Sequence, residues 1–153
     1  MRPETPWLDT ARYPFRSRFF TQPRGEMHYI DEGEGPVLVF VHGNPTWSFT
    51  WRHLIAAFRR THRCVAMDHL GFGLSDKPGE PMSPAEHAEN LTRLLDHLQV
   101  DRVTLVVEDW GGPIGFSWAL QRAERLARAV VFNSWLWSVR GDPHFERFSG
   151  REV

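Results

Sequence analysis

The feature that most constrains the fold of this chain is the series of short apolar runs along it. The run VLVFV at Val37–Val41 lacks the polar alternation of a strand with one wet face. It is therefore typical of a strand that is covered on both faces in a parallel sheet. The preceding residues 31–36 (DEGEGP) are dense in turn formers and separate this strand from an earlier one. Further strands are predicted at residues 17–22, 26–31, 63–67, 102–107 and 129–132.

Helical patterns fill the intervals between the later strands. Residues 83–86 (SPAE) have the capping-box pattern with proline at the first helical position, which predicts a helix to residue 98. Leu91, Leu94, Leu95 and Leu98 recur at helical spacing on its expected buried face. Two other helices are predicted, at residues 48–59 and 111–122. This alternation predicts an α/β fold with about six strands in a mostly parallel sheet, right-handed crossovers, and helices on both faces.

The amino-acid composition limits which binding partners and which cellular location are expected. With 41% hydrophobic and 24% charged residues, the 153-residue chain is expected to form a soluble, globular domain. The formal net charge of -1 gives no long-range field that attracts nucleic acid or anionic lipid, so neither is an expected partner. The single cysteine, Cys64, cannot form an internal disulfide, and no run resembles a signal peptide or a membrane span. A cytoplasmic location is therefore expected.

Three polar segments follow predicted strands. They are residues 42–48 (HGNPTWS), 68–78 (DHLGFGLSDKP) and 108–115 (EDWGGPIG). In open α/β sheets the reactive groups gather beyond the carboxyl ends of the strands. We therefore expect these three segments to meet at one end of the sheet.

The third segment has the layout of a nucleophile elbow. A buried strand runs into one polar residue, Asp109, and small residues then let the chain turn at once into a helix. A serine in this place must be deprotonated before it attacks, whereas a carboxylate is already ionised at neutral pH and attacks carbon directly. The positive end of the following helix dipole favours that anion. The alternative is that Asp109 only caps the helix.

Together these segments resemble the signature loops of haloalkane dehalogenases, a family of α/β-hydrolases, and the similarity extends over residues 19–148. Each segment occurs in other α/β-hydrolases, but the combination of Asn44, Asp109 and Trp110 is characteristic. The resemblance implies the N-terminal part of the α/β-hydrolase fold. It also implies hydrolysis of haloalkanes to alcohol and halide through an aspartyl ester, with halogenated hydrocarbon and water as substrates and with no cofactor or metal.

The resemblance also assigns roles to the three residues. Asp109 is expected to be the nucleophile, while the Trp110 indole and the Asn44 side-chain amide bind the departing halide. The backbone N–H groups of Asn44 and Trp110 are expected to form the oxyanion hole. Neutral N–H donors in a dry pocket stabilise a developing anion without the positive charge that would retain the product. Packing in the core is the alternative explanation for Trp110.

Other polar and aromatic residues receive simpler interpretations. His42 is expected to pin its loop rather than bind metal, since no second ligand stands at metal spacing. Residues 71–75 (GFGLS) lack the lysine of a phosphate loop and are expected to form a tight turn. Four aromatic residues are candidates for lining the pocket: Phe20, Trp47, Trp135 and Trp137.

The histidine and the acid that complete the catalytic triad of this family, with Asp109 as nucleophile, are not evident in the sequence. Asn133 stands where some family members carry a glutamate after the sixth strand, which indicates the branch with a late catalytic aspartate. His144 is the only histidine after Phe132, and the resemblance puts it where the cap domain begins. The chain is therefore expected to lack the catalytic histidine and acid, most of the cap, and strands seven and eight. Losing the base typically costs about 10⁴-fold to 10⁶-fold in turnover.

These expectations divide the chain into an N-terminal extension (1–16), an incomplete hydrolase core (17–138) and the start of a cap region (139–153). Residues 129–132 are expected to form an uncovered apolar edge strand that favours self-association. Two alternative functions remain open. One is an epoxide hydrolase, which also uses an aspartate nucleophile, and the other is a non-catalytic remnant or interaction protein.

Overall fold

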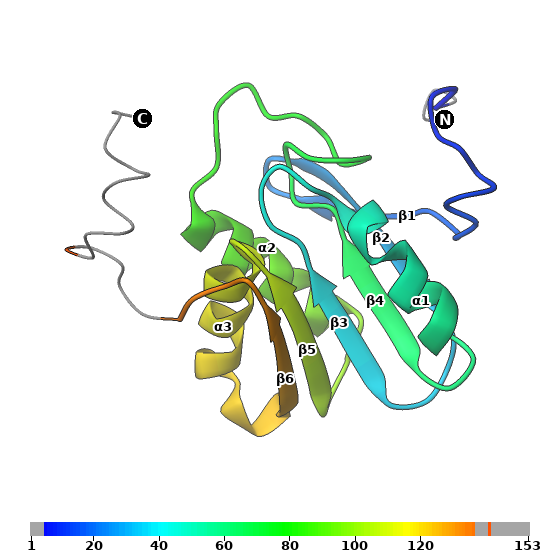
Figure 1. Ribbon diagram of the computed structural model, residues 1–153. Coiled ribbons are helices and arrows are strands. Elements are labelled where there is room, and N and C mark those ends of the chain that lie inside the picture. The colour runs from blue at the N-terminus through cyan, green and yellow to red at the C-terminus, as the bar shows by residue number, and fades with distance from the viewer. Residues whose placement is uncertain (1–4, 137–140, 142–153) are drawn as a thin grey trace.

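Six strands form one sheet in the order β1-β2-β4-β3-β5-β6 (Figure 1). The computed structural model describes residues 5–136 and 141. The strands are β1 (Arg18–Gln22), β2 (Gly25–Glu32), β3 (Val37–Val41), β4 (Arg63–Met67), β5 (Val103–Glu108) and β6 (Leu126–Phe132). β1 and β2 form an antiparallel hairpin, β2 is antiparallel to β4, and the other pairs are parallel. The predicted α/β class and mostly parallel sheet are confirmed.

Helices cover both faces of the sheet, as predicted. α2 (Pro84–His97) and α3 (Gly111–Gln121) pack on one face, and α1 (Arg52–Phe58) packs on the other (Figure 1). The predicted helix at 48–59 begins as the 3-10 turn η1 (Ser48–Trp51), and a second 3-10 turn, η2 (Ala123–Arg125), precedes β6. β6 starts three residues before its predicted start at Ala129, because Leu126 already pairs with Val103. β5 starts one residue late, because Arg102 has a φ of 50°, outside the range of a strand.

The predicted capping box starts α2. The Ser83 hydroxyl accepts a hydrogen bond from the Glu86 N–H, and the Glu86 carboxylate accepts one from the Ser83 N–H at 2.7 Å. Pro84 is the first helical residue, where its missing N–H has no intrahelical partner to lose. Leu91, Leu94 and Leu95 are fully buried on this helix, as expected from their spacing.

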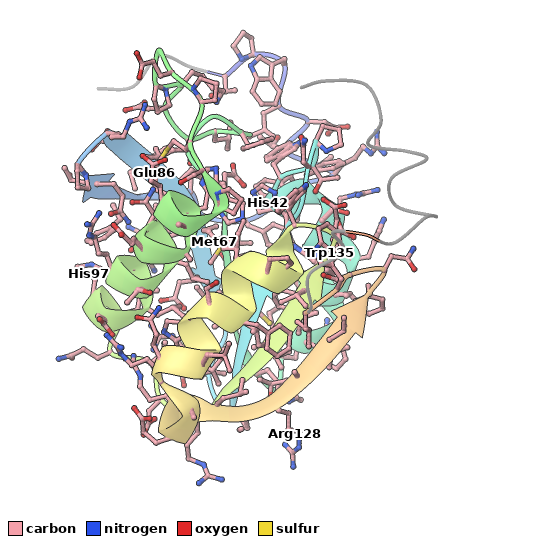
Figure 2. The ribbon with its side chains drawn as sticks, turned by 90° about the vertical axis from the view of Figure 1, so that its left-hand side faces the viewer. His42, Met67, Glu86, His97, Arg128 and Trp135 are labelled. Carbon is pink, nitrogen blue, oxygen red and sulfur yellow. The ribbon has the colours of Figure 1, made fainter. Side chains whose placement is uncertain are left out.

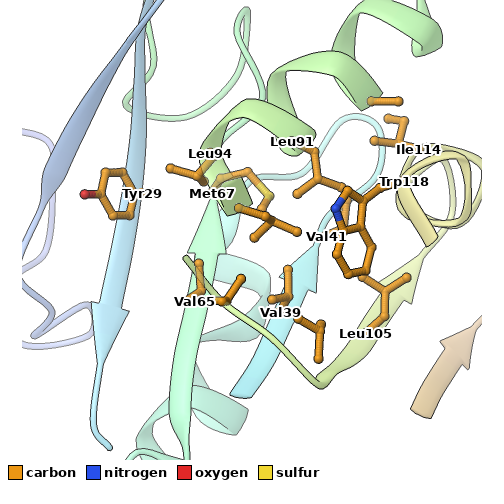
Figure 3. Packing of buried hydrophobic residues seen from close by; sticks show 14 of the residues in the cluster. Tyr29, Val39, Val41, Val65, Met67, Leu91, Leu94, Leu105, Ile114 and Trp118 are labelled. Carbon is orange, nitrogen blue, oxygen red and sulfur yellow. The ribbon is translucent and has the colours of Figure 1, made fainter. Parts of the chain in front are cut away.

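Two hydrophobic clusters fill the spaces above and below the sheet. Alternate residues of β3 point to opposite faces, so Val39 and Val41 belong to the cluster under α2 and α3. Leu38 and Phe40 belong to the cluster under α1. Figure 3 shows the first cluster, in which Trp118 of α3 lies beside the leucines of α2 and the strand residues. The sheet is therefore covered on both sides, which explains the unbroken apolar run of β3.

β6 ends the sheet and is largely exposed. Val130, Val131 and Phe132 keep 42%, 44% and 45% of their surface exposed. Between α1 and β6 lies an open apolar groove of about 300 Å³. Residues lining it include Phe40, Leu54, Phe58, Val106, Val130 and Phe132. The predicted uncovered apolar edge strand is confirmed. None of the helices in the described part of the chain has the length and apolar character to cross a membrane.

Candidate active site

The three polar segments meet at one end of the sheet because their strands are parallel neighbours. β4, β3 and β5 lie side by side, and Val41 pairs with Val107 near the point where their loops begin. In Figure 2, His42 and Trp135 lie toward this end of the sheet, and Arg128 of β6 lies at the opposite end. The expectation that the segments come together is confirmed.

Asp109 occupies a sharp turn between β5 and α3. Its φ is 48°, in the left-handed region that non-glycine residues seldom adopt. Such a conformation costs about 1–3 kcal/mol and persists only where the surroundings impose it. Here the Asp109 N–H donates to the Asn133 carbonyl at 3.2 Å, and the Ser134 hydroxyl donates to the Asp109 carbonyl at 2.6 Å. The turn therefore has the geometry of a nucleophile elbow, held by the residues that follow β6.

Two glycines permit the close approach of the first and third loops. A Cβ on Gly111 would collide with the backbone carbonyl of Val41. A Cβ on Gly43 would collide with the side chain of Asp109. The backbone N–H of Asn44 can consequently reach the Asp109 carboxylate, and it donates to Oδ1 at 2.8 Å.

This contact bears on the alternative role of Asp109 as a helix cap. No side chain accepts a capping hydrogen bond at the start of α3, where the cap position is Trp110. The half-buried Asp109 carboxylate instead accepts the N–H from the neighbouring loop. Capping therefore does not explain why an aspartate stands at this position.

Asn44 and Trp110 lie together at the wall of a cavity of about 420 Å³. Trp110 is 39% exposed, so packing in the core does not account for it. Its indole ring meets Trp135 edge to face, with 5.1 Å between ring centroids. Apolar side chains make up much of the remaining wall: Leu70, Phe72, Pro81, Met82, Pro84 and Ile114. The structure thus brings Asn44 and Trp110 to one cavity beside Asp109.

Three histidines, His42, His69 and His87, form a cluster of mutually tilted rings at the same cavity. Adjacent ring centroids are 4.3 Å and 4.9 Å apart. The His42 ring accepts a hydrogen bond from the His69 backbone N–H at 2.9 Å and donates to the Gly43 carbonyl at 2.8 Å. His42 therefore pins the two loops together, in line with its predicted structural role.

The environment of this histidine cluster favours neutral rings. Burial lowers the pKa of all three side chains, and it lowers that of His69 well below the usual value. For His69 the neighbouring His42 and His87 lower the pKa further. Sequence reasoning missed His69 and His87, although His69 is the second residue after a strand, in the polar segment 68–78. The cavity therefore has polar but uncharged imidazoles on one side.

The expected aromatic lining is wrong for the three described candidates. Phe20 stacks on His97, with 4.6 Å between centroids. Trp47 stacks on Phe49 and packs against the cluster under α1. Trp135 contacts Trp110 and is not one of the residues that line the cavity. The fourth candidate, Trp137, lies outside the described residues.

The outer wall of the cavity is tied to the β1–β2 turn. Glu80 belongs to this wall, in the segment before α2. The Arg24 guanidinium donates to the Glu80 carbonyl at 3.0 Å and to the Glu86 carboxylate at 2.9 Å. Figure 2 shows Glu86 in the first turn of α2 and His97 in its last turn. A single arginine therefore ties both the wall segment and the first turn of α2 to the β1–β2 turn.

Comparison with known protein families identifies the class of protein. The family model of the alpha/beta hydrolase fold matches residues 36–147. The chain belongs to the α/β-hydrolase fold family, and its six-stranded sheet is a partial version of that fold.

Individual relatives give a narrower relationship. The chain is 48% identical to Haloalkane dehalogenase 2 of Mycobacterium tuberculosis over 84% of its own length and 46% of the relative. It is 45% identical to cis-3-alkyl-4-alkyloxetan-2-one decarboxylase of Shewanella oneidensis, over 83% of the chain and 41% of the relative. The resemblance to haloalkane dehalogenases is thus confirmed at the level of homologues. The chain spans about half the length of the curated relatives it matches.

Solved structures agree with this relationship. The haloalkane dehalogenase DatA of Agrobacterium tumefaciens superimposes with a TM-score of 0.78 at 28% identity, over 89% of this chain and 48% of that one. A structure described among novel epoxide hydrolases from hot-environment metagenomes gives a TM-score of 0.71 at 35% identity, over 78% of this chain and 42% of that one.

Proposed function

We propose that this chain carries the nucleophile and the halide-binding half of a hydrolase acting on carbon–halogen bonds. The observation that supports this most is Asp109 in a left-handed turn, with its carboxylate bound to the Asn44 N–H beside the cavity. The substrates are a small haloalkane and water, and the products are an alcohol and halide. The reaction uses no cofactor or metal.

We infer different tasks for the two carboxylate oxygens of Asp109. Asn44 holds Oδ1, so Oδ2 is the oxygen that attacks the carbon bearing the halogen. A C–O bond forms as the carbon–halogen bond breaks, and the halide leaves with the electron pair. The Trp110 indole N–H and the Asn44 side-chain amide bind that halide. Oδ1 becomes the carbonyl oxygen of the ester, where the backbone N–H groups of Asn44 and Trp110 stabilise the later oxyanion.

Hydrolysis of the ester is a separate step that needs a base to activate water. We propose that the base and its supporting acid are not supplied by residues 5–136. The neutral histidine cluster in that region serves to pin the loops, and Asn133 cannot act as the acid. The reaction expected of residues 5–136 is therefore one alkylation of Asp109 without hydrolysis of the ester.

The test is incubation of the folded chain with 1-bromobutane, followed by intact-mass analysis, peptide mapping and bromide measurement. We expect one butyl group on Asp109 and one equivalent of bromide. Asp109→Asn should give neither, and Trp110→Phe should alkylate about 10²-fold to 10³-fold more slowly because one N–H donor is lost. Absence of both adduct and bromide from the folded wild-type chain would contradict the proposal. Continuous bromide release would contradict the proposal that residues 5–136 supply no base for hydrolysis of the ester.

A second candidate function comes from the relatives named cis-3-alkyl-4-alkyloxetan-2-one decarboxylases. Opening of such a lactone ring at its alkyl carbon leaves a carboxylate, and the N–H donors of Asn44 and Trp110 suit that anion as well as halide. The epoxide hydrolase and the non-catalytic alternatives also stand. Parallel incubations with a cis-dialkyl oxetanone and with an epoxide distinguish them, because each electrophile leaves a different mass on Asp109 and a non-catalytic protein gains none.

We also propose the setting and the organisation of the chain. The buried Cys64 thiol has its pKa raised to about 11, chiefly by burial, which makes it inert and compatible with a reducing cytoplasm. The exposed strand β6 is proposed to support self-association. The divisions 1–16, 17–138 and 139–153 remain our proposal for the domain boundaries, with Tyr13 and Phe15 of the first segment buried in the core.

A further inference from the structure

We propose that Ser17, His28 and Asp68 form a second nucleophilic centre that accepts acyl and phosphoryl groups from activated electrophiles. The Ser17 Oγ lies 3.0 Å from His28 Nε2. On the other side of the ring, His28 Nδ1 lies 3.0 Å from Asp68 Oδ2. A serine, a histidine and an aspartate thus stand in hydrogen-bonded series, the arrangement that activates serine in unrelated folds.

Strand pairing explains how three distant residues meet. Ser17 directly precedes β1, His28 lies in β2, and Asp68 directly follows β4. β2 lies between β1 and β4, and the Asp68 N–H donates to the His28 carbonyl at 2.9 Å. The array therefore lies across the antiparallel side of the sheet, and its aspartate contacts the loop after β3 through the Ser48 N–H.

The hydrogen bonds of Asp68 determine where the His28 proton lies. The Ser48 N–H donates to Oδ1 at 2.8 Å and the Leu74 N–H donates to Oδ2 at 2.7 Å. Burial by itself raises the pKa of Asp68, but the interactions with His28, Ser48 and Leu74 together bring this pKa below its ordinary value. The carboxylate is thus ionised and can only accept, so His28 Nδ1 must donate. In the neutral ring, Nε2 then carries the lone pair and accepts the Ser17 hydroxyl proton.

The solvent exposure of the three side chains suits a nucleophilic centre, in which the serine is accessible and its base is shielded. The side chains of His28 and Asp68 are fully buried, whereas Ser17 is exposed. Water and reagents consequently reach the nucleophile while the base and its orienting carboxylate are shielded. The Phe19 ring packs on His28 with 5.3 Å between centroids and is 37% exposed. It offers an apolar surface beside Ser17 for the chain of an acyl or alkylphosphonyl group.

The expected step is an ordinary displacement. With a fluorophosphonate, the Ser17 Oγ–phosphorus bond forms, the phosphorus–fluorine bond breaks, and fluoride leaves with the electron pair. The hydroxyl proton passes to His28 Nε2, and Asp68 stabilises the resulting imidazolium. With a p-nitrophenyl ester, the Oγ–acyl bond forms and nitrophenolate leaves in the same way.

The test is reaction of the purified chain with an alkyl fluorophosphonate at pH 7.5, read by peptide mass spectrometry over time. Ser83 is the internal control because it is exposed and its hydroxyl bonds to Glu86 rather than to a histidine. General-base help is worth about 10²-fold to 10⁴-fold, so Ser17 should be labelled at least about 100-fold faster than Ser83. Equal labelling of Ser17 and Ser83 in the wild-type chain overturns the proposal.

Variants separate this centre from Asp109 and from a merely structural network. Asp109→Asn should leave the labelling rate at Ser17 unchanged, and Ser17→Ala should remove the adduct. His28→Gln, if its circular dichroism matches the wild type, should label Ser17 no faster than Ser83. Unchanged labelling in a folded His28→Gln chain would refute the role of His28. If that variant does not fold, the comparison of Ser17 with Ser83 in the wild type still decides.

Discussion

Replacing Asp68 with asparagine tests the buried polar network most directly. The substitution keeps the shape of the side chain and removes its charge. One amide oxygen can still accept the Ser48 N–H, but the amide nitrogen then stands where Oδ2 accepted from Leu74 and His28. His28 can move its proton to Nε2 and accept from the amide. The Leu74 N–H loses its bond to Oδ2.

These changes determine how much stability the Asp68→Asn chain is expected to lose. Losing the acceptor of a partly buried donor costs up to about 1–3 kcal/mol, and a hydrogen bond to a charged group exceeds a neutral one by about 1 kcal/mol. The free energy of unfolding should therefore fall by about 2–4 kcal/mol. This is somewhat less than the 3–5 kcal/mol typical of breaking a buried ion pair, because His28 recovers a hydrogen bond.

The assay is urea denaturation at pH 7.5, followed by tryptophan fluorescence. Glu34→Gln is the matched control, since Glu34 is exposed and the change should stay within about 0.5 kcal/mol. When the His28 proton moves to Nε2, that nitrogen can no longer accept the Ser17 hydroxyl proton. In the Asp68→Asn chain, Ser17 should therefore be labelled no faster than Ser83. An Asp68→Asn chain as stable as the Glu34→Gln chain would refute the ionised, fully bonded state of Asp68.

Three further predictions concern the core and the site. Lowering the pH from 7.5 to 5.5 should reduce the free energy of unfolding. The histidine cluster has lowered pKa values in the folded chain, so the unfolded chain takes up protons first. Each histidine can reduce the free energy of unfolding by up to about 1.4 kcal/mol per pH unit. Urea titrations across this range check it, and a flat profile would contradict buried neutral rings. Leu94→Ala should cost about 2–5 kcal/mol, while Leu120→Ala, at 83% exposed, should change stability little. Gly111→Ala should lower the free energy of unfolding by about 1–3 kcal/mol or more, because the new methyl group pushes into the Val41 carbonyl. Gly79→Ala is the control, since a Cβ there meets no atom within 4 Å. Thermal unfolding compares the two variants, and equal melting temperatures would count against the close contact of the loops.

Much of the fold could be predicted from local patterns. The apolar runs of β3 and β5 and the capping box of α2 are written within a few consecutive residues, and the structure has them in those places. The position of Asp109 was equally readable, because a strand, one polar residue and two glycines occupy a short stretch.

The parts that could not be predicted depend on contacts between distant residues. Arg24 meets Glu86 at a separation of 62 residues, and His28 meets Asp68 at a separation of 40. Periodicity says nothing of such pairs. The prediction of which aromatic side chains line the cavity was wrong for a related reason. The direction of a side chain in a loop, such as that of Trp47, follows from backbone dihedrals that composition does not specify.

The anchoring of the cavity wall by Arg24 has a consequence for how the shape of the cavity can change. The arginine and its Glu86 partner keep 33% and 40% of their side-chain surface exposed, so dissolved salt weakens their attraction. Ionic strength should therefore change how firmly the hairpin turn holds this wall, although Arg24 is not among the residues that line the cavity. Variation in that turn can therefore alter the position of the wall while Asp109 and its bond from the Asn44 N–H stay as they are.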